Sequence, residues 1–128
     1  MSGNLVDEWV EKAEYDYEAA LSLHRKRAKP LHGIVCFHTQ QCAEKYLKAF
    51  LSMIKRPFPR THDLISLREE AAKEYGTFAL IQDVLKILDA YSVEVRYPGD
   101  EPDRKEADRA VKAMKEVRTF VRGKLKGI

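Results

Sequence analysis

The sequence is poor in the residues on which several classes of protein depend. Its 128 residues include two cysteines, six glycines and one tryptophan. No apolar run approaches the ~20 residues that span a bilayer. The N-terminus also lacks the basic segment followed by an apolar segment that marks a secretory signal. We therefore expect a cytosolic (cytoplasmic) protein that does not associate with a membrane.

The two cysteines and four histidines do not have the spacing of a metal site. Cys36 and Cys42 are six residues apart on one predicted helix. That spacing is roughly 9 Å along the helix axis, which is too far for a disulfide between them. His38 shares a helical face with Cys42, but a structural zinc site needs four ligands. We expect two reduced, buried thiols, no metal and no cofactor.

The signatures of nucleophilic catalysis are missing as well. The sequence contains no Gly-rich phosphate loop and no nucleophile elbow. Nothing in it supplies an orienting group or an oxyanion hole for a Cys–His pair. It also shows no alternation typical of strands, no internal repeat and no low-complexity segment. Nucleophilic catalysis and β-structure are therefore not expected.

What the sequence does contain is helical periodicity. Apolar residues recur at spacings of three and four, which is typical of amphipathic helices. Pro and Gly interrupt this pattern, which gives five predicted helices, at residues 4–27, 31–55, 62–75, 78–92 and 103–125. Short connections place successive helices antiparallel, and a chain of this size has room for one core. The predicted fold class is all-α, an antiparallel up-and-down bundle of four to five helices in a single domain, residues 1–128.

Residues at the predicted helix ends favour similar boundaries. Lys55 and Arg56 are expected to face the last carbonyls of the second helix. Thr61 and Thr77 are the expected N-caps of the third and fourth helices. The last helix is expected to begin with a capping box formed by Asp103 and Glu106.

The second predicted helix combines an apolar stripe with a polar edge. Glu44 and Lys48 are one turn apart in the favourable orientation, and Gln41 and Lys45 are also neighbours. Lysines on a helix flank are usually solvated. Contact with a phosphate group is the alternative that we keep for Lys45 and Lys48.

Charge alternates along the chain, although the formal net charge is only +3. Residues 1–23 hold six acidic residues and one basic residue, whereas residues 24–60 hold one acidic and nine basic residues. Residues 61–103 hold ten acidic and four basic residues, and residues 104–128 hold three acidic and nine basic residues. Helices of opposite charge can attract one another inside a bundle. A basic surface for a phosphate-bearing ligand is the alternative. Both interpretations stay open here.

The second helix also carries a resemblance. The run Gln40-Gln41-Cys42-Ala43-Glu44-Lys45-Tyr46-Leu47-Lys48-Ala49, followed by Pro57, Pro59 and Thr61-His62-Asp63-Leu64, resembles the signature of the HEPN domain family, especially its prokaryotic members. Ala13-x-x-Asp16-Tyr17-x-x-Ala20 before it and Tyr91 through Arg96-Tyr97-Pro98 after it fit the same family. The resemblance covers about residues 5 to 125. It implies a small helical bundle, commonly dimeric, associated with nucleotide binding, RNA cleavage or pairing with a small nucleotidyltransferase.

The loop after the fourth predicted helix holds the residue that we favour for ligand binding. The guanidinium of Arg96 could meet a phosphate bidentately, and the ring of Tyr97 could stack on a base. Capping of the fourth helix, or an ion pair with Glu94, is the alternative for Arg96. HEPN ribonucleases carry an Arg followed four to six residues later by a His. No His follows His62 in this sequence, so the family's cleavage motif is incomplete.

Three functions remain as hypotheses. The first is a non-catalytic HEPN protein that binds a nucleotide or RNA phosphate near Arg96, with Tyr97, Lys45, Lys48 and His62 as further contacts. It would be a homodimer, paired with a minimal nucleotidyltransferase in a toxin–antitoxin manner. The second is a toxin-like, metal-free endoribonuclease in which Arg96 and His62 are catalytic. The alternative for His62 is a histidine hydrogen-bonded locally in the first turn of a helix. The third is a pure protein-interaction module.

Overall fold

The computed structural model describes residues 2–93 and 98–126, and within these ranges it is helical without any strand. The elements follow in the order α1 (Ser2–His24), α2 (His32–Met53), α3 (Leu64–Ala72), the 3₁₀ helix η1 (Gly76–Ile81), α4 (Gln82–Asp89) and α5 (Arg104–Lys126). The prediction of an all-α bundle is confirmed.

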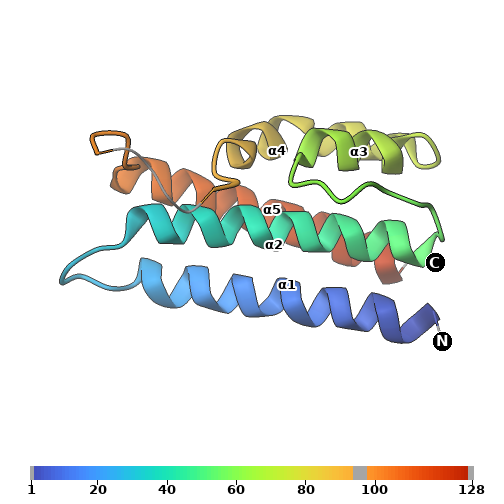
Figure 1. Ribbon diagram of the computed structural model, residues 1–128, viewed down its shortest axis with the longest axis horizontal. Helices are drawn as coiled ribbons and strands as arrows, with labels where there is room; N and C mark the ends of the chain where they lie inside the picture. Colours follow the sequence, from blue (N-terminus) through green and yellow to red (C-terminus); the bar gives the residue numbers. More distant parts are fainter. Residues whose placement is uncertain (1, 94–97, 127–128) are drawn as a thin grey trace.

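The helix α2 is the centre of the bundle. It packs against α1, α3, α4 and α5, whereas α1 touches α5 only slightly. Figure 1 shows α1 and α2 antiparallel and side by side, with α5 behind α2 and with α3 and α4 along the remaining side. The turn between α1 and α2 lies at the same end of the bundle as the start of α5, opposite the N-terminal end of α1 (Figure 1).

The core forms around the apolar stripe of α2. Tyr46, Leu47 and Phe50 are fully buried on it. The ring of Phe50 lies 4.5 Å from that of Phe78, and the ring of Phe78 lies 5.0 Å from that of Phe120, measured between centroids. These contacts join α2, η1 and α5 in one continuous core, as the size of the chain predicted.

The two cysteines lie in this core. Both Cys36 and Cys42 are buried, and neither forms a disulfide. Burial raises the pKa of the Cys42 thiol, and the carboxylates of Asp16 and Glu14 add to the effect. The thiol is therefore protonated and poorly nucleophilic, as expected of a structural cysteine.

The start of α3 differs from the prediction. Its N-cap is Asp63, whose carboxylate accepts hydrogen bonds from the backbone N–H groups of Ile65 at 3.0 Å and Ser66 at 3.2 Å. Thr61 is therefore not the cap. Its hydroxyl oxygen instead accepts the backbone N–H of Asp63 at 3.0 Å. Asp is at least as good an N-cap as Thr, and here it stands directly before the helix.

The fourth predicted helix is divided into two elements. Residues 76–81 form η1, and α4 begins only at Gln82. The N-cap residues are Tyr75 for η1 and Ile81 for α4, so the prediction that Thr77 is an N-cap was wrong. The capping box at the start of α5 is confirmed: the backbone N–H of Glu106 donates to Asp103 at 2.9 Å, and that of Asp103 donates to Glu106 at 3.1 Å.

The helix α2 ends in a Schellman motif without glycine. The backbone N–H of Lys55 donates to the carbonyl of Ser52 at 3.1 Å, and that of Arg56 donates to the carbonyl of Leu51 at 2.9 Å. Lys55 adopts the left-handed conformation that this motif requires, with φ 57°. Backbone groups, rather than the predicted basic side chains, therefore satisfy these carbonyls.

Candidate functional site

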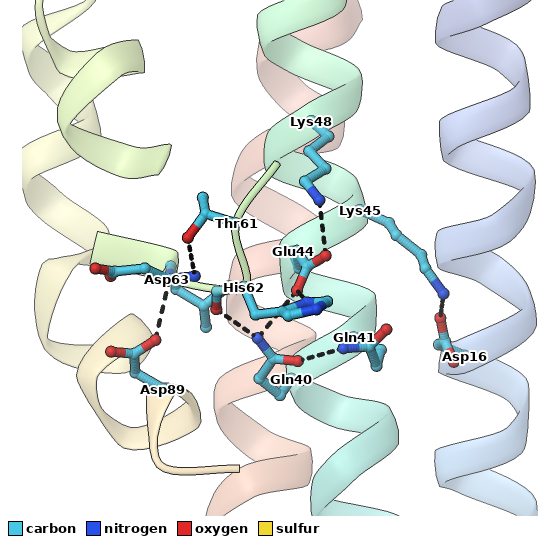
Figure 2. A network of polar contacts seen from close by, with 11 residues as sticks. Asp16, Gln40, Gln41, Glu44, Lys45, Lys48, Thr61, His62, Asp63 and Asp89 are labelled. Carbon is cyan, nitrogen blue, oxygen red and sulfur yellow. Dashed lines mark hydrogen bonds and ion pairs between the residues drawn. The ribbon is translucent and has the colours of Figure 1, made fainter. Parts of the chain in front are cut away.

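A polar network runs along α2 and joins it to α1 and to the connector between α2 and α3 (Figure 2). Gln40, Glu44 and Lys48 on α2 and Asp16 on α1 belong to it, and all four are buried. Solvation on the helix flank was the bland interpretation of Lys48, and it was wrong, because Lys48 is buried together with Glu44. Since α2 is the central helix, α1 and the connector cover positions that would be exposed on an isolated amphipathic helix.

Glu44 is the centre of this network. Its side chain is only 4% exposed, and its carboxylate accepts a hydrogen bond from Nζ of Lys48 at 2.8 Å. Gln40 donates to the same carboxylate at 3.3 Å and to the backbone carbonyl of His62 at 3.0 Å. A buried carboxylate is costly unless it is paired and hydrogen-bonded, and these contacts meet that need.

His62 completes the Glu44 cluster from the connector. Its Nδ1 lies 2.8 Å from Oε1 of Glu44, although 67% of its side chain is exposed. The contact joins residues 18 positions apart, so it is not the local hydrogen bond considered as an alternative. When Nδ1–H of the neutral ring donates to Glu44, the lone pair stays on Nε2. The site therefore presents an oriented, accessible imidazole.

Asp16 organises a second cluster of the same composition. Its carboxylate accepts a hydrogen bond from Nζ of Lys45 at 2.5 Å and lies 2.8 Å from Nδ1 of His38. Each cluster thus combines a buried carboxylate, a lysine and a histidine bound through Nδ1. The histidine of this second cluster is less accessible, since 26% of the His38 side chain is exposed. Lys45 and Lys48, two of the predicted phosphate contacts, are both ion-paired within the protein.

A third cluster, which the sequence reasoning missed, ties α1 to α5. Arg118 donates two hydrogen bonds to the carboxylate of Glu14, both at 2.8 Å, and the hydroxyl of Tyr46 donates to it as well. Arg118 lowers the pKa of Glu14, while burial opposes that shift and the bond from Tyr46 reinforces it. Burial, together with the Glu14 bond, raises the pKa of Tyr46 to about 12. The acidic and basic blocks were a signal of such pairs but did not identify the partners.

Ion pairs between helices account for part of the charge alternation. Asp16–Lys45, Glu14–Arg118 and Arg56–Glu70 each join an acidic block to a basic one. Other exposed cations make no ion pair with any residue in the ranges 2–93 and 98–126, and nine of these are concentrated in two segments. They are Arg25, Lys26, Arg27, Lys29, Arg104, Lys105, Arg109, Lys112 and Lys115, and we term them the basic end.

The basic end consists of residues from two segments that are distant in the sequence and close together in the fold. Four of its residues follow α1, and five lie on α5. His24, the last residue of α1, joins the segments, because its Nε2 lies 2.9 Å from Oδ1 of Asp108 on α5. The turn after α1 and the start of α5 lie at the same end of the bundle, and the α5 segment extends from there toward its middle (Figure 1).

A cavity of about 410 Å³ opens at the same end. It is lined by Pro30, Leu31, His32, Gly33, Ile34, Glu101 and Pro102. The first turn of α2 forms part of this lining, and among the described residues its N-cap, Leu31, provides no side-chain hydrogen bond to it. Uncapped N–H groups at a helix N-terminus favour an anion. The arrangement suits a phosphate or carboxylate ligand.

The predicted site residues therefore do not form one site. His62, Lys45 and Lys48 lie along the middle of α2, whereas the cavity lies at its N-terminus. His32 at the cavity and Glu44 in the network are twelve residues apart, roughly 18 Å along the helix. Arg96 and Tyr97 lie outside the described residues, so their roles remain predictions.

Within residues 2–93 and 98–126, no three or more His, Cys, Asp or Glu residues are grouped so that they could hold a metal ion. No helix in those ranges has the length and apolar character required to cross a membrane.

Comparison with known proteins identifies the family. The sequence model of the HEPN domain matches residues 6–124. No curated protein sequence matches the chain. Among solved structures, TT1696 from Thermus thermophilus is similar, with 23% identity over 93% of this chain and 97% of that chain and a TM-score of 0.77. ST0689, an archaeal HEPN homologue, is also similar, with 24% identity, 93% and 96% coverage and a TM-score of 0.73. Because the family match spans nearly the whole chain, this protein belongs to the HEPN domain family.

Proposed function

We propose that this HEPN protein binds a nucleotide or an RNA phosphate group at the α1–α2 end of the bundle, with Arg96 and Tyr97 among its contacts. The observation that carries the proposal is that the basic end borders the cavity at the N-terminus of α2, whose N-cap residue makes no side-chain hydrogen bond. In the sequence, Arg96 and Tyr97 stand five and four residues before Glu101, which lines that cavity. Binding of this kind does not require the incomplete cleavage motif.

The chemistry of the surroundings supports this choice of ligand. A phosphate group accepts hydrogen bonds from backbone N–H groups at a helix N-terminus and is favoured by the helix dipole. An Arg guanidinium binds it through two parallel hydrogen bonds, and an aromatic ring can stack on the base. A nucleotide can use all three kinds of contact together.

Isothermal titration with nucleoside triphosphates and short RNA tests the proposal. We expect Arg96→Ala to weaken binding at least about tenfold, because it removes both charge-assisted hydrogen bonds of the guanidinium. Arg60→Ala is the matched control, because Arg60 is an exposed arginine outside the basic end. The absence of heat with every ligand, both for the protein alone and with a nucleotidyltransferase present, would contradict the proposal.

We also propose that the protein is a cytoplasmic homodimer paired with a separately encoded minimal nucleotidyltransferase, as in a toxin–antitoxin system. Membership of the HEPN family supports this, because HEPN domains often dimerise. Light scattering should then give twice the chain mass of 14.8 kDa. The sequence of the adjoining gene tests the partner, and a monomer in solution would reject the dimer.

A second candidate function, a metal-independent endoribonuclease, is favoured by the contact between Glu44 and His62. A buried carboxylate that fixes the tautomer of an accessible imidazole is an arrangement suited to general acid–base catalysis. His62 would take the proton of a ribose 2′-hydroxyl while its oxygen attacks phosphorus. The 5′-oxygen would leave with a proton returned by the imidazolium. The products would be a 2′,3′-cyclic phosphate and a 5′-hydroxyl.

Incubation with total RNA in the presence of EDTA decides on this candidate. We expect His62→Ala to lower cleavage by at least about 100-fold. His38→Ala should leave cleavage unchanged, because His38 makes the same kind of contact but is less accessible. Intact RNA would end this candidate without affecting the binding proposal. Intact RNA, together with the absence of ligand binding, would leave a pure protein-interaction module as the one remaining hypothesis of the three.

A further inference from the structure

The five basic-end residues on α5 share one face of that helix. At 100° per residue, Arg104, Lys105, Arg109, Lys112 and Lys115 fall opposite the buried stripe that contains Ala107, Ala110 and Met114. All five are exposed. From Arg104 to Lys115 the row extends roughly 16 Å along the helix axis.

The carboxylates around this row leave it net positive. Within the same face, Asp108 is already engaged by His24 at 2.9 Å, and Glu116 stands at the far end. Asp100, Glu101 and Asp103 precede the helix. Glu106 lies in the first turn of α5 and belongs to its capping box. Against these six carboxylates stand nine cations, and none of the nine makes an ion pair with a residue in the described ranges.

The row on α5 continues into the turn after α1. The contact between His24 and Asp108 holds the C-terminal end of α1 beside the first half of α5. The cavity is lined by residues 30–34, which directly follow the turn, and by Glu101 and Pro102, which directly precede α5. The cations therefore form one surface that consists of the turn after α1 and one face of α5, and this surface borders the cavity.

We infer that this surface binds a single strand of nucleic acid along α5, through several consecutive phosphates. The inference rests on the proposed function and names its ligand as a strand, not an isolated nucleotide. One nucleotide in the cavity cannot reach cations spread over roughly 16 Å, whereas a strand with one phosphate per ~3.4 Å presents about five charges over that distance. Such a strand would neutralise these mutually repelling cations, which make no ion pair with any residue in the ranges 2–93 and 98–126.

Fluorescence anisotropy with a labelled 12-nucleotide oligo(U) RNA, and with oligo(dT) of the same length, tests the inference. The variant Arg109→Gln/Lys112→Gln removes two charges from the α5 row. Its matched control, Lys12→Gln/Lys86→Gln, removes two charges from exposed positions outside the basic end that make no ion pair in the described ranges. Both variants have the same net charge, so a difference between them reports the position of the charges.

We expect the α5 variant to bind RNA about tenfold more weakly and the control to bind within twofold of wild type. The slope of log K against log salt should become shallower by ~1.4, for two lost contacts with a single strand. Binding of ATP should weaken less than binding of RNA does in the α5 variant, because a single nucleotide at the cavity does not extend along the whole row. If oligo(dT) binds with the same affinity as oligo(U), the surface recognises the phosphodiester chain that DNA and RNA share. If only RNA binds, the strand is RNA.

Three results would overturn the inference. The first is an equal loss of RNA binding in both double variants, which would show a general effect of net charge. The second is unchanged RNA affinity and salt slope in the α5 variant. The third is weakened capture of an acidic protein partner by the α5 variant with RNA binding intact, which would assign the surface to a protein. Normal ATP binding in any of these cases leaves the proposed function standing.

Discussion

Nδ1 of the exposed His62 lies 2.8 Å from Oε1 of Glu44, one of the most deeply buried carboxylates in the described chain. The other carboxylate oxygen accepts a hydrogen bond from Nζ of Lys48, also at 2.8 Å. Lys48 therefore supplies a counter-charge within the protein, and the imidazole can be neutral without leaving Glu44 unpaired. The contact also fastens the connector between α2 and α3 to the middle of α2.

Replacing Glu44 with Gln should lower the free energy of unfolding by about 3 kcal/mol, because the ammonium group of Lys48 would remain buried without a carboxylate. Urea unfolding measures this change. The double variant Glu44→Gln/Lys48→Met should recover much of the loss. His62→Ala should cost less than about 1 kcal/mol, since the imidazole is largely exposed. A Glu44→Gln protein as stable as wild type would show that the pair is not needed for folding.

Replacing Lys55 with Gly should raise the free energy of unfolding by up to about 1 kcal/mol. Lys55 has φ 57°, a conformation that is strained for a residue with a side chain and relaxed for glycine. Thermal and urea unfolding both measure this gain. Lys86→Gly serves as the contrast, because Lys86 lies inside α4, where glycine costs about 1 kcal/mol. Equal destabilisation by both changes would contradict the Schellman geometry.

Asp63→Ala should cost about 1 kcal/mol, because it removes the acceptor for the first N–H groups of α3. Thr61→Ala should cost less, since it removes only the single bond from the backbone N–H of Asp63. Comparing the two variants in one urea series decides which residue caps the helix. A larger loss for Thr61→Ala would restore the capping role predicted from the sequence.

The free energy of unfolding should decrease as the pH is lowered in the acid range, in part because Glu14 becomes protonated. Arg118 lowers the pKa of this carboxyl in the folded protein below its ordinary value of 4.5. The unfolded state therefore binds the proton more readily. The stabilisation is complete above the unfolded-state pKa and is lost as pH falls through the folded-state pKa. Urea unfolding between pH 3 and 7, for wild type and Glu14→Gln, measures the effect.

Glu14→Gln should show a weaker dependence of stability on pH below about 4.5 than wild type does. Glu18→Gln is the control, because Glu18 is an exposed carboxylate on the same helix without an ion pair in the described ranges. Identical pH profiles for wild type and Glu14→Gln would mean that Arg118 does not bind the carboxylate in solution.

The helical framework was predictable because it depends on local patterns. Spacings of three and four gave the helices, and the i, i+4 spacing of Glu44 and Lys48 anticipated their ion pair, which is present at 2.8 Å. The burial of that pair was not predictable. It depends on tertiary contacts with α1 and with the connector, such as the contact of His62 with Glu44, 18 positions away in the sequence.

Long-range pairing limited the prediction of the site in the same way. Arg118 and Glu14 are 104 residues apart, and no local pattern relates them. The basic end likewise requires α1 and α5 to meet, which the block charges allowed but did not specify. His62 was named as a candidate from its sequence context, but its carboxylate partner became known only from the packing of the connector on α2.

The position of α2, in contact with every other α-helix described, also limits where the chain can change length. One residue inserted within α2 would turn every later side chain of that helix by about 100°. Such an insertion near its middle would move Phe50 and Leu51 out of the core, and the neighbouring helices could not all follow. Insertions and deletions should therefore be tolerated in the connectors and rejected within this helix.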